Sequence, residues 1–225
     1  MKTLLLCCLL WALLETGTSI SCEVCVGVHK SCTGPVQVCS KELDSCGIIK
    51  AESVVGNIKT PMFTKACVSS SQCNLAPLYI TFGNGISISS NVACCVGEAC
   101  KTATVSVPPA NTTLNGRRCP ACYSAFSHDC NEEIIDCTGT QTHCLHLSGT
   151  AKSGQTTVKT TMKGCASESA CINMQQLKGT FGGIDAHFTT AECSPVSSRV
   201  DTVAPEGAGL IFSALLTVLL VNIVS

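Results

Sequence analysis

Apolar and polar positions alternate through the middle of this 225-residue chain, in pairs of short segments that flank glycine-containing turns. The clearest pair is 78–82 and 86–90, around Gly83-Asn84-Gly85, because Asn-Gly between alternating apolar residues is a strong hairpin signal. Further hairpins are predicted for 47–54 with 59–68, for 144–149 with 156–164, and for the residues on either side of 182–185. No segment between the two apolar ends keeps a helical period. The pattern therefore predicts an all-β protein.

The cysteines repeat their spacing along the chain. Successive gaps are 3, 7, 7, 7, 21, 6 and 21 residues in one series, and 3, 8, 7, 7, 21, 6 and 22 in the next. The first series is Cys22, Cys25, Cys32, Cys39, Cys46, Cys67, Cys73 and Cys94, and the second is Cys119, Cys122, Cys130, Cys137, Cys144, Cys165, Cys171 and Cys193. This repeat indicates two copies of one disulfide-linked module. Each copy is small and poor in aromatic residues, so disulfides worth about 2–5 kcal/mol each have to supplement its core.

The ends of the chain predict export. Lys2 followed by the apolar run 4–14 and a small-residue stretch is typical of a signal peptide, with cleavage before Ile20. Cys7 and Cys8 leave with this peptide, so eighteen cysteines remain, and an oxidising compartment favours their pairing. The expected organisation is a signal peptide at 1–19, a first module at 20–101, a linker at 102–118, a second module at 119–194, and a spacer with an apolar tail at 195–225.

The C-terminal tail, 210–224, is short for a membrane span and is not followed by a basic residue. A polar spacer before such a tail is typical of a glycosylphosphatidylinositol (GPI) attachment signal, which we favour over a retained tail. The attachment residue stays open. Ser198 has the right spacer but is followed by Val200 at the third position, whereas 207–209 are all small but leave almost no spacer.

The linker contains Pro108-Pro109 and the sequon Asn111-Thr112-Thr113. Both are typical of an exposed, extended connector. We therefore expect an N-linked glycan on Asn111.

The order of close and distant cysteines, with adjacent Cys94-Cys95 and Cys100 shortly after them, resembles the Ly-6/uPAR family of three-finger proteins. The resemblance covers essentially the whole mature chain and implies two tandem, disulfide-rich, snake-toxin-like three-finger domains. It also implies a pairing that spacing alone leaves open. The implied pairs are Cys22–Cys46, Cys25–Cys32, Cys39–Cys67, Cys73–Cys94, Cys95–Cys100, Cys119–Cys144, Cys122–Cys130, Cys137–Cys165 and Cys171–Cys193.

The second copy lacks the last cysteine pair, because Ser194 follows Cys193 and no cysteine comes later. This truncated copy after a complete one, together with the phrases at 38–46 and 139–144, resembles the γ-type phospholipase A2 inhibitors. Two features depart from the families. Lys101 stands where Ly-6 proteins usually have Asn, and soluble inhibitors of this type lack an apolar tail.

The sequence predicts no catalytic, metal or cofactor site. Cys22-x-x-Cys25 and Cys119-x-x-Cys122 have the spacing of half a zinc site, but full pairing in an oxidising compartment leaves no thiolate for a metal. Ser127-His128-Asp129-Cys130 has a His-Asp beside a cysteine, as in secreted phospholipases A2, but no adjacent cysteine pair precedes the His and no calcium loop is present. Glu132-Glu133 is interpreted as solvated surface. We therefore expect a protein that is not an enzyme.

A formal net charge of −1 with scattered charges gives no reason to expect a nucleic-acid partner. The first hypothesis is a binding protein tethered by lipid to the extracellular face of the cell membrane, which recognises a protein through its finger tips. The candidate tips are Gly56-Asn57, Asn84-Gly85, Ala151 to Gly154, and Gly182-Gly183. The alternative, implied by resemblance, is a secreted inhibitor that binds phospholipase A2 directly, as a monomer or an oligomer. A third class, a structural mucosal or sperm-coat component, stays open.

Overall fold

A computed structural model describes residues 19–28, 30–153, 156–176, 180–181 and 184–196. The predicted signal peptide, apart from its last residue, lies outside these residues, as do most of the spacer, the apolar tail, Gly154, Gly182 and Gly183. Among the residues that the structure describes, no helix is long and apolar enough to cross a membrane.

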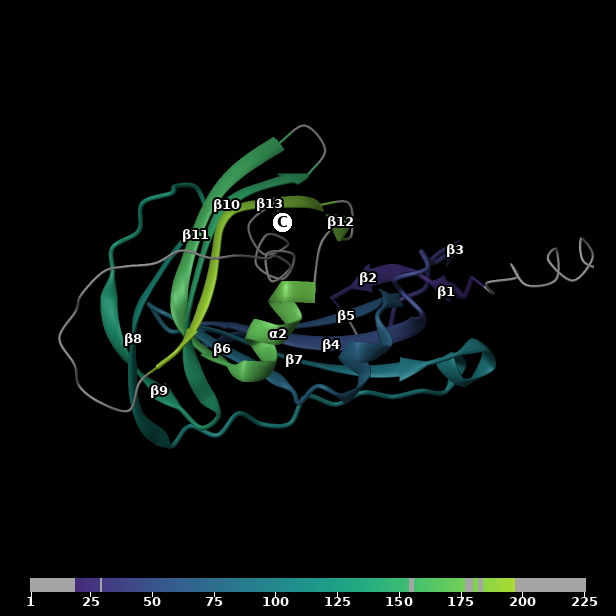
Figure 1. Ribbon diagram of the computed structural model, residues 1–225, viewed down its shortest axis with the longest axis horizontal. Helices are drawn as coiled ribbons and strands as arrows, with labels where there is room; N and C mark the ends of the chain where they lie inside the picture. The colour runs from purple at the N-terminus through teal and green to yellow at the C-terminus, as the bar shows by residue number, and fades with distance from the viewer. Residues whose placement is uncertain (1–18, 29, 154–155, 177–179, 182–183, 197–225) are drawn as a thin grey trace, which may run out of the picture.

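The first module consists of three fingers (Figure 1). Its strands are β1 (Ser21–Glu23), β2 (Cys25–Gly27), β3 (Val36–Val38), β4 (Ser45–Val55), β5 (Ile58–Val68), β6 (Leu78–Phe82) and β7 (Ile86–Cys95), with 3-10 turns η1 (Ser70–Asn74) and η2 (Gly97–Lys101). β4 pairs with both β5 and β7, so the second and third fingers form one sheet. Asn84 and Gly85, at the tip of the third finger, have φ of 62° and 69°, as the predicted Asn-Gly turn requires.

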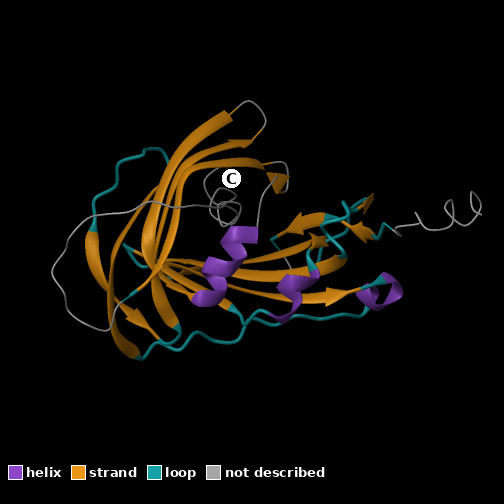
Figure 2. Cartoon of the chain, viewed as in Figure 1, coloured by secondary structure: helices purple, strands orange, loops and turns teal. Residues whose placement is uncertain are grey.

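The second module repeats this arrangement. It consists of β8 (Leu114–Ser124), β9 (Glu133–Thr138), β10 (Gln141–Ser153), β11 (Thr156–Ser167), α2 (Glu168–Gln176), β12 (Thr180–Phe181) and β13 (Ile184–Pro195). Strands dominate both modules (Figure 2), so the all-β fold class predicted from the sequence is confirmed.

Nine disulfides link the strands and loops of the two modules within the residues that the structure describes. They are Cys22–Cys46, Cys25–Cys32, Cys39–Cys67, Cys73–Cys94, Cys95–Cys100, Cys119–Cys144, Cys122–Cys130, Cys137–Cys165 and Cys171–Cys193. Two sulfur trios, from Cys22, Cys39, Cys67 and from Cys119, Cys137, Cys165, are close enough to surround a metal ion. Every one of these sulfurs belongs to a disulfide, so neither trio offers the thiolates that a zinc site needs.

Helix α2 is not predicted from the sequence. Its apolar residues Ala170, Cys171 and Met174 lie at helical spacing and are buried in the core. The hydroxyl of Ser167 accepts the N–H of Ala170 at 3.4 Å, which is a helix N-cap contact. With only nine residues, the helix is too short to show a sustained period in the sequence.

The two modules share one sheet and the largest core cluster. The strand order is β12-β13-β10-β11-β6-β7-β4-β5-β2, in which β11 of the second module pairs with β6 of the first. In Figure 1, β10, β11 and β13 rise from the plane of the first module, and α2 lies in the angle between them. The largest core cluster combines Ile80, Phe82, Ile86 and Ile88 from one module with Leu145, Leu147, Met162, Ala166, Met174 and Phe188 from the other.

Candidate functional site

The junction between the modules begins with backbone pairing. Gly164, Cys165 and Ala166 of β11 lie opposite Phe82, Thr81 and Ile80 of β6. The approach is so close that a Cβ on Gly164 would lie 2.0 Å from the carbonyl oxygen of Thr81. Glycine at 164 is therefore required for the two modules to meet as they do.

Gln141 ties the junction through its side chain, which is almost fully buried. Its Nε2 donates to Thr81 Oγ1 at 2.7 Å, and its Oε1 accepts the N–H of Thr138 at 3.1 Å. Both ends of the amide are thus satisfied, as a buried polar group requires.

A second set of contacts joins the start of α2 to the segment that leads into β6. The N–H of Tyr79 donates to Ser167 Oγ at 3.0 Å, and Ser169 Oγ donates to the carbonyl of Pro77 at 2.9 Å. Ser167 and Ser169 are themselves joined at 2.8 Å. These serines fix segment 77–79 of the first module on the second.

The third contact between the modules involves the predicted binding tip at Asn84-Gly85. The carboxylate of Glu133 accepts the N–H of Asn84 at 2.9 Å, and Gly83 packs so closely that a Cβ there would lie 2.6 Å from the same carboxylate oxygen. The tip at Asn84-Gly85 is therefore docked on the second module on one side. Glu132 and Glu133 are both exposed, as predicted from the sequence, but each also has a partner, because Glu132 forms an ion pair with Lys163.

The other predicted binding tips have different surroundings from Asn84-Gly85. Asn57 and Ile58 are exposed, and the N–H of Gly56 donates to the carbonyl of Gly85 at 3.3 Å, which joins the ends of the second and third fingers. In the tip at Ala151 to Gly154, β10 pairs with both β11 and β13 up to Ser153, and Lys152 is exposed. The remaining candidates in that tip and at Gly182-Gly183 lie outside the described residues.

The linker is hydrogen-bonded to β6 and β7 of the first module. Tyr79 Oη donates to the carbonyl of Pro108 at 3.0 Å, and Asn91 Nδ2 donates to the carbonyl of Ser106 at 2.8 Å. Burial raises the pKa of Tyr79. Asn111 is exposed on this linker, and its Oδ1 accepts the N–H of Thr113 at 2.9 Å.

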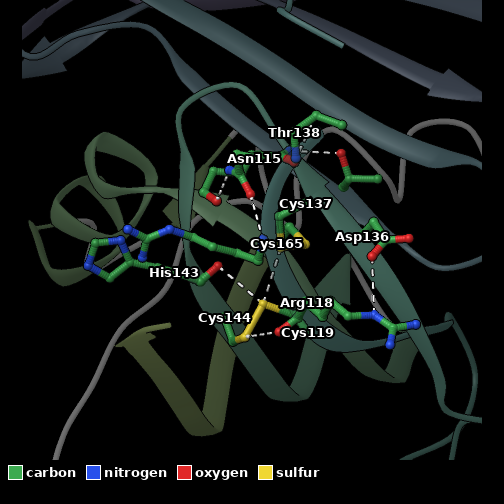
Figure 3. The surroundings of a disulfide bond; sticks show 12 residues. Asn115, Arg118, Cys119, Asp136, Cys137, Thr138, His143, Cys144 and Cys165 are labelled. Carbon is green, nitrogen blue, oxygen red and sulfur yellow. Dashed lines mark hydrogen bonds and ion pairs between the residues drawn. A yellow bond between two sulfur atoms is a disulfide. The ribbon is translucent and has the colours of Figure 1, made fainter. Parts of the chain in front are cut away.

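At the base of the second module, the linker's end holds the end of β13. Arg117 donates from Nη1 to the carbonyls of Val196, at 2.6 Å, and Thr142, at 3.2 Å. Asn115 Nδ2 donates to the carbonyls of Gly139 and Gln141. Figure 3 shows the surroundings of the Cys119–Cys144 disulfide, with Asn115 above it in the view and the Arg118–Asp136 ion pair to its right. In the first module the corresponding end is closed by Cys95–Cys100, the pair that the second module lacks.

The loop with His128 lies over β10 and β11, tethered by Cys122–Cys130. His128 Nδ1 lies 3.3 Å from Ser148 Oγ, which also lies 3.0 Å from Thr161 Oγ1. A small cavity of about 330 Å³ between loop and sheet also contacts His146 and Lys163. Burial, followed by the charge of Lys163, lowers the pKa of His146, against an opposing effect of Glu192 and Glu132.

Comparison with known proteins covers most of the chain. The phospholipase A2 inhibitor family model matches residues 20–102, and the u-PAR/Ly-6 domain model matches residues 115–198. A phospholipase A2 inhibitor gamma subunit from Gloydius brevicaudus siniticus is 33% identical over 201 residues, which cover 87% of this chain and 97% of the relative. The chain belongs to the phospholipase A2 inhibitor family.

A second member of the family, phospholipase A2 inhibitor NAI from Notechis ater, is 32% identical over 206 residues, which cover 88% of this chain and 100% of the relative. Among solved structures, the crystal structure of mouse TEX101 is 18% identical, with 78% of this chain and 99% of that chain covered and a TM-score of 0.34. That score is too low to support an argument about this inhibitor-family chain. The resemblance to the γ-type inhibitors that the sequence indicates is confirmed by these two relatives.

Proposed function

We propose that this chain is an extracellular, non-enzymatic protein that inhibits phospholipase A2 by binding it. The observation that carries the proposal is the 33% identity to a phospholipase A2 inhibitor over 97% of that protein's length. It supports the inhibitor hypothesis better than the hypothesis of a tethered binding protein with an unrelated partner.

The shared sheet and core support binding through a rigid surface. Because disulfides and junction contacts already order both modules, little conformational entropy remains to be lost when a partner docks. Several apolar side chains remain exposed for contact with a partner. They include Val36 and Val38 on β3, Ile58 at the second finger, and Phe126 in the loop of the second module.

The histidine loop does not suggest hydrolysis. Ser148 is shared between His128 and Thr161, and no hydrogen bond within the described residues joins the carboxylate of Asp129 to the His128 ring. A serine nucleophile needs a base that a third group orients. We assign His128 a role in holding the loop on the sheet.

The N-linked glycan on Asn111 and the lipid anchor are two further parts of the proposal, and each needs its own test. An Asn111→Gln variant should migrate faster on a denaturing gel, and wild-type protein should shift to the same position after enzymatic removal of N-glycans.

Release of protein from expressing cells by phosphatidylinositol-specific phospholipase C supports a lipid anchor. Protein found entirely in the medium supports a freely secreted inhibitor.

The inhibitor function is tested by adding the purified protein to a panel of secreted phospholipase A2 isoforms hydrolysing phospholipid vesicles. We expect the rate to fall with at least one isoform and to saturate with protein concentration. The same protein with its disulfides reduced is the control. Unchanged rates with every isoform would overturn the proposal.

A further inference from the structure

A groove of about 600 Å³ opens where the modules meet. Segment 74–79 of the first module forms one wall, and Thr140, Thr142 and the start of α2 form the other. Neither module alone contains both walls. The groove exists only because β6 pairs with β11.

Disulfides anchor both walls of the groove. Cys73–Cys94 anchors the residue just before segment 74–79, and Cys171–Cys193 anchors the residue just before Ile172. The two walls are joined by the contacts from Ser167 to Tyr79 and from Ser169 to Pro77. A groove with such walls is preformed, and its volume is within the range of pockets that bind ligand groups.

The lining combines apolar surface with one charge. Leu75, Pro77, Tyr79 and Ile172 are partly buried side chains of the lining. Glu168, in the first turn of α2, is exposed and is the single ionisable acid or base of the lining besides the Tyr79 phenol. Within the described part of the chain, no Lys, Arg or His pairs with the Glu168 carboxylate. The groove is thus complementary to an apolar group that carries a cation beside it.

We infer that this groove receives an apolar side chain flanked by Lys or Arg from the lipid-contacting surface of phospholipase A2. This inference rests on the proposed function. An enzyme that works on aggregated phospholipids has to expose apolar side chains where it meets the lipid, and basic residues strengthen that contact with anionic lipids. Occupying the groove takes that surface away from the lipid, so inhibition follows without contact with the catalytic groups.

The test uses the full disulfide-bonded protein and an isoform that the wild type inhibits. Ala76→Phe fills the groove from an exposed position, and Glu168→Lys reverses its charge. Matched controls are Ala99→Phe and Glu42→Lys, which make the same changes at exposed positions away from the groove. We expect each groove variant to raise the inhibition constant at least tenfold, and each control to leave it within about twofold.

Thermal unfolding of every variant checks that the fold persists, and Glu168→Gln provides a milder second variant with a smaller loss and a weaker salt dependence. If the wild type inhibits and the groove variants inhibit equally well, the groove assignment is overturned while the proposed function stands. If the wild type inhibits no isoform, the proposed function fails and the assignment fails with it.

Discussion

The hydroxyl of Ser167 accepts a hydrogen bond from the backbone N–H of Tyr79 at 3.0 Å, although 88 residues separate the two in sequence. The same hydroxyl accepts the N–H of Ala170 at 3.4 Å and contacts Ser169 Oγ at 2.8 Å. Ser167 is only 3% exposed. One buried side chain therefore caps α2 and fixes the first module against the second.

Ser167→Ala should lower the free energy of unfolding by about 1–3 kcal/mol, because it leaves buried N–H groups without an acceptor. Urea unfolding with intact disulfides measures this loss. Ser106→Ala is the control, since Ser106 is exposed and bonds Asn91 through its carbonyl rather than its hydroxyl. Equal stability of the two variants would contradict the role assigned to Ser167.

Gly164→Ala should separate β6 from β11, because the added Cβ would meet the Thr81 carbonyl oxygen at 2.0 Å. We expect a larger radius of gyration by small-angle X-ray scattering and faster proteolysis at residues 102–113, the part of the linker before β8. Gly56→Asn is the control, because φ is 60° there, open space surrounds the site and Asn tolerates this conformation. A compact, protease-resistant Gly164→Ala protein would show that the modules do not depend on this contact.

Features that are local or regularly spaced can be predicted from the sequence. The paired gaps between cysteines indicate two copies of one module, and Asn84-Gly85 indicates a hairpin. The junction cannot be predicted in this way. The alternation of Ile80, Phe82, Ile86 and Ile88 shows that one face is buried, but not that the second module buries it.

Residues that act at the junction also lack a signal in the sequence. Gln141 and Glu133 look like ordinary surface residues, and their partners Thr81 and Asn84 lie 60 and 49 residues away. Contacts of this kind depend on tertiary packing, which neither propensity nor period encodes.

Arg117→Ala should destabilise the protein by about 2 kcal/mol, because a charged donor to two backbone carbonyls is lost at the end of β13. Arg118→Ala is the neighbouring control. Its partner Asp136 is exposed, and such surface ion pairs contribute about 0–1 kcal/mol. Denaturant unfolding of both variants distinguishes the two roles, and a loss confined to Arg118→Ala would refute our assignment.

His146 should make stability depend on pH. Burial and Lys163 lower the pKa of His146, so the folded state favours the neutral imidazole. The resulting stability is fully present above the ordinary pKa of 6.5 and is lost as the pH falls through and below that value. Unfolding measured from pH 8 to pH 5 should show a steeper decline for the wild type than for His146→Gln. His187→Gln, at an exposed position, is the matched control, and an equal decline in wild type and His146→Gln would exclude His146 as the source.

Isothermal titration of the disulfide-intact protein with a purified secreted phospholipase A2 tests the central claim most directly. Membership of the inhibitor family and the preformed two-module surface predict saturable binding to at least one isoform, which weakens in the Gly164→Ala variant. Absence of binding to every isoform would contradict the account.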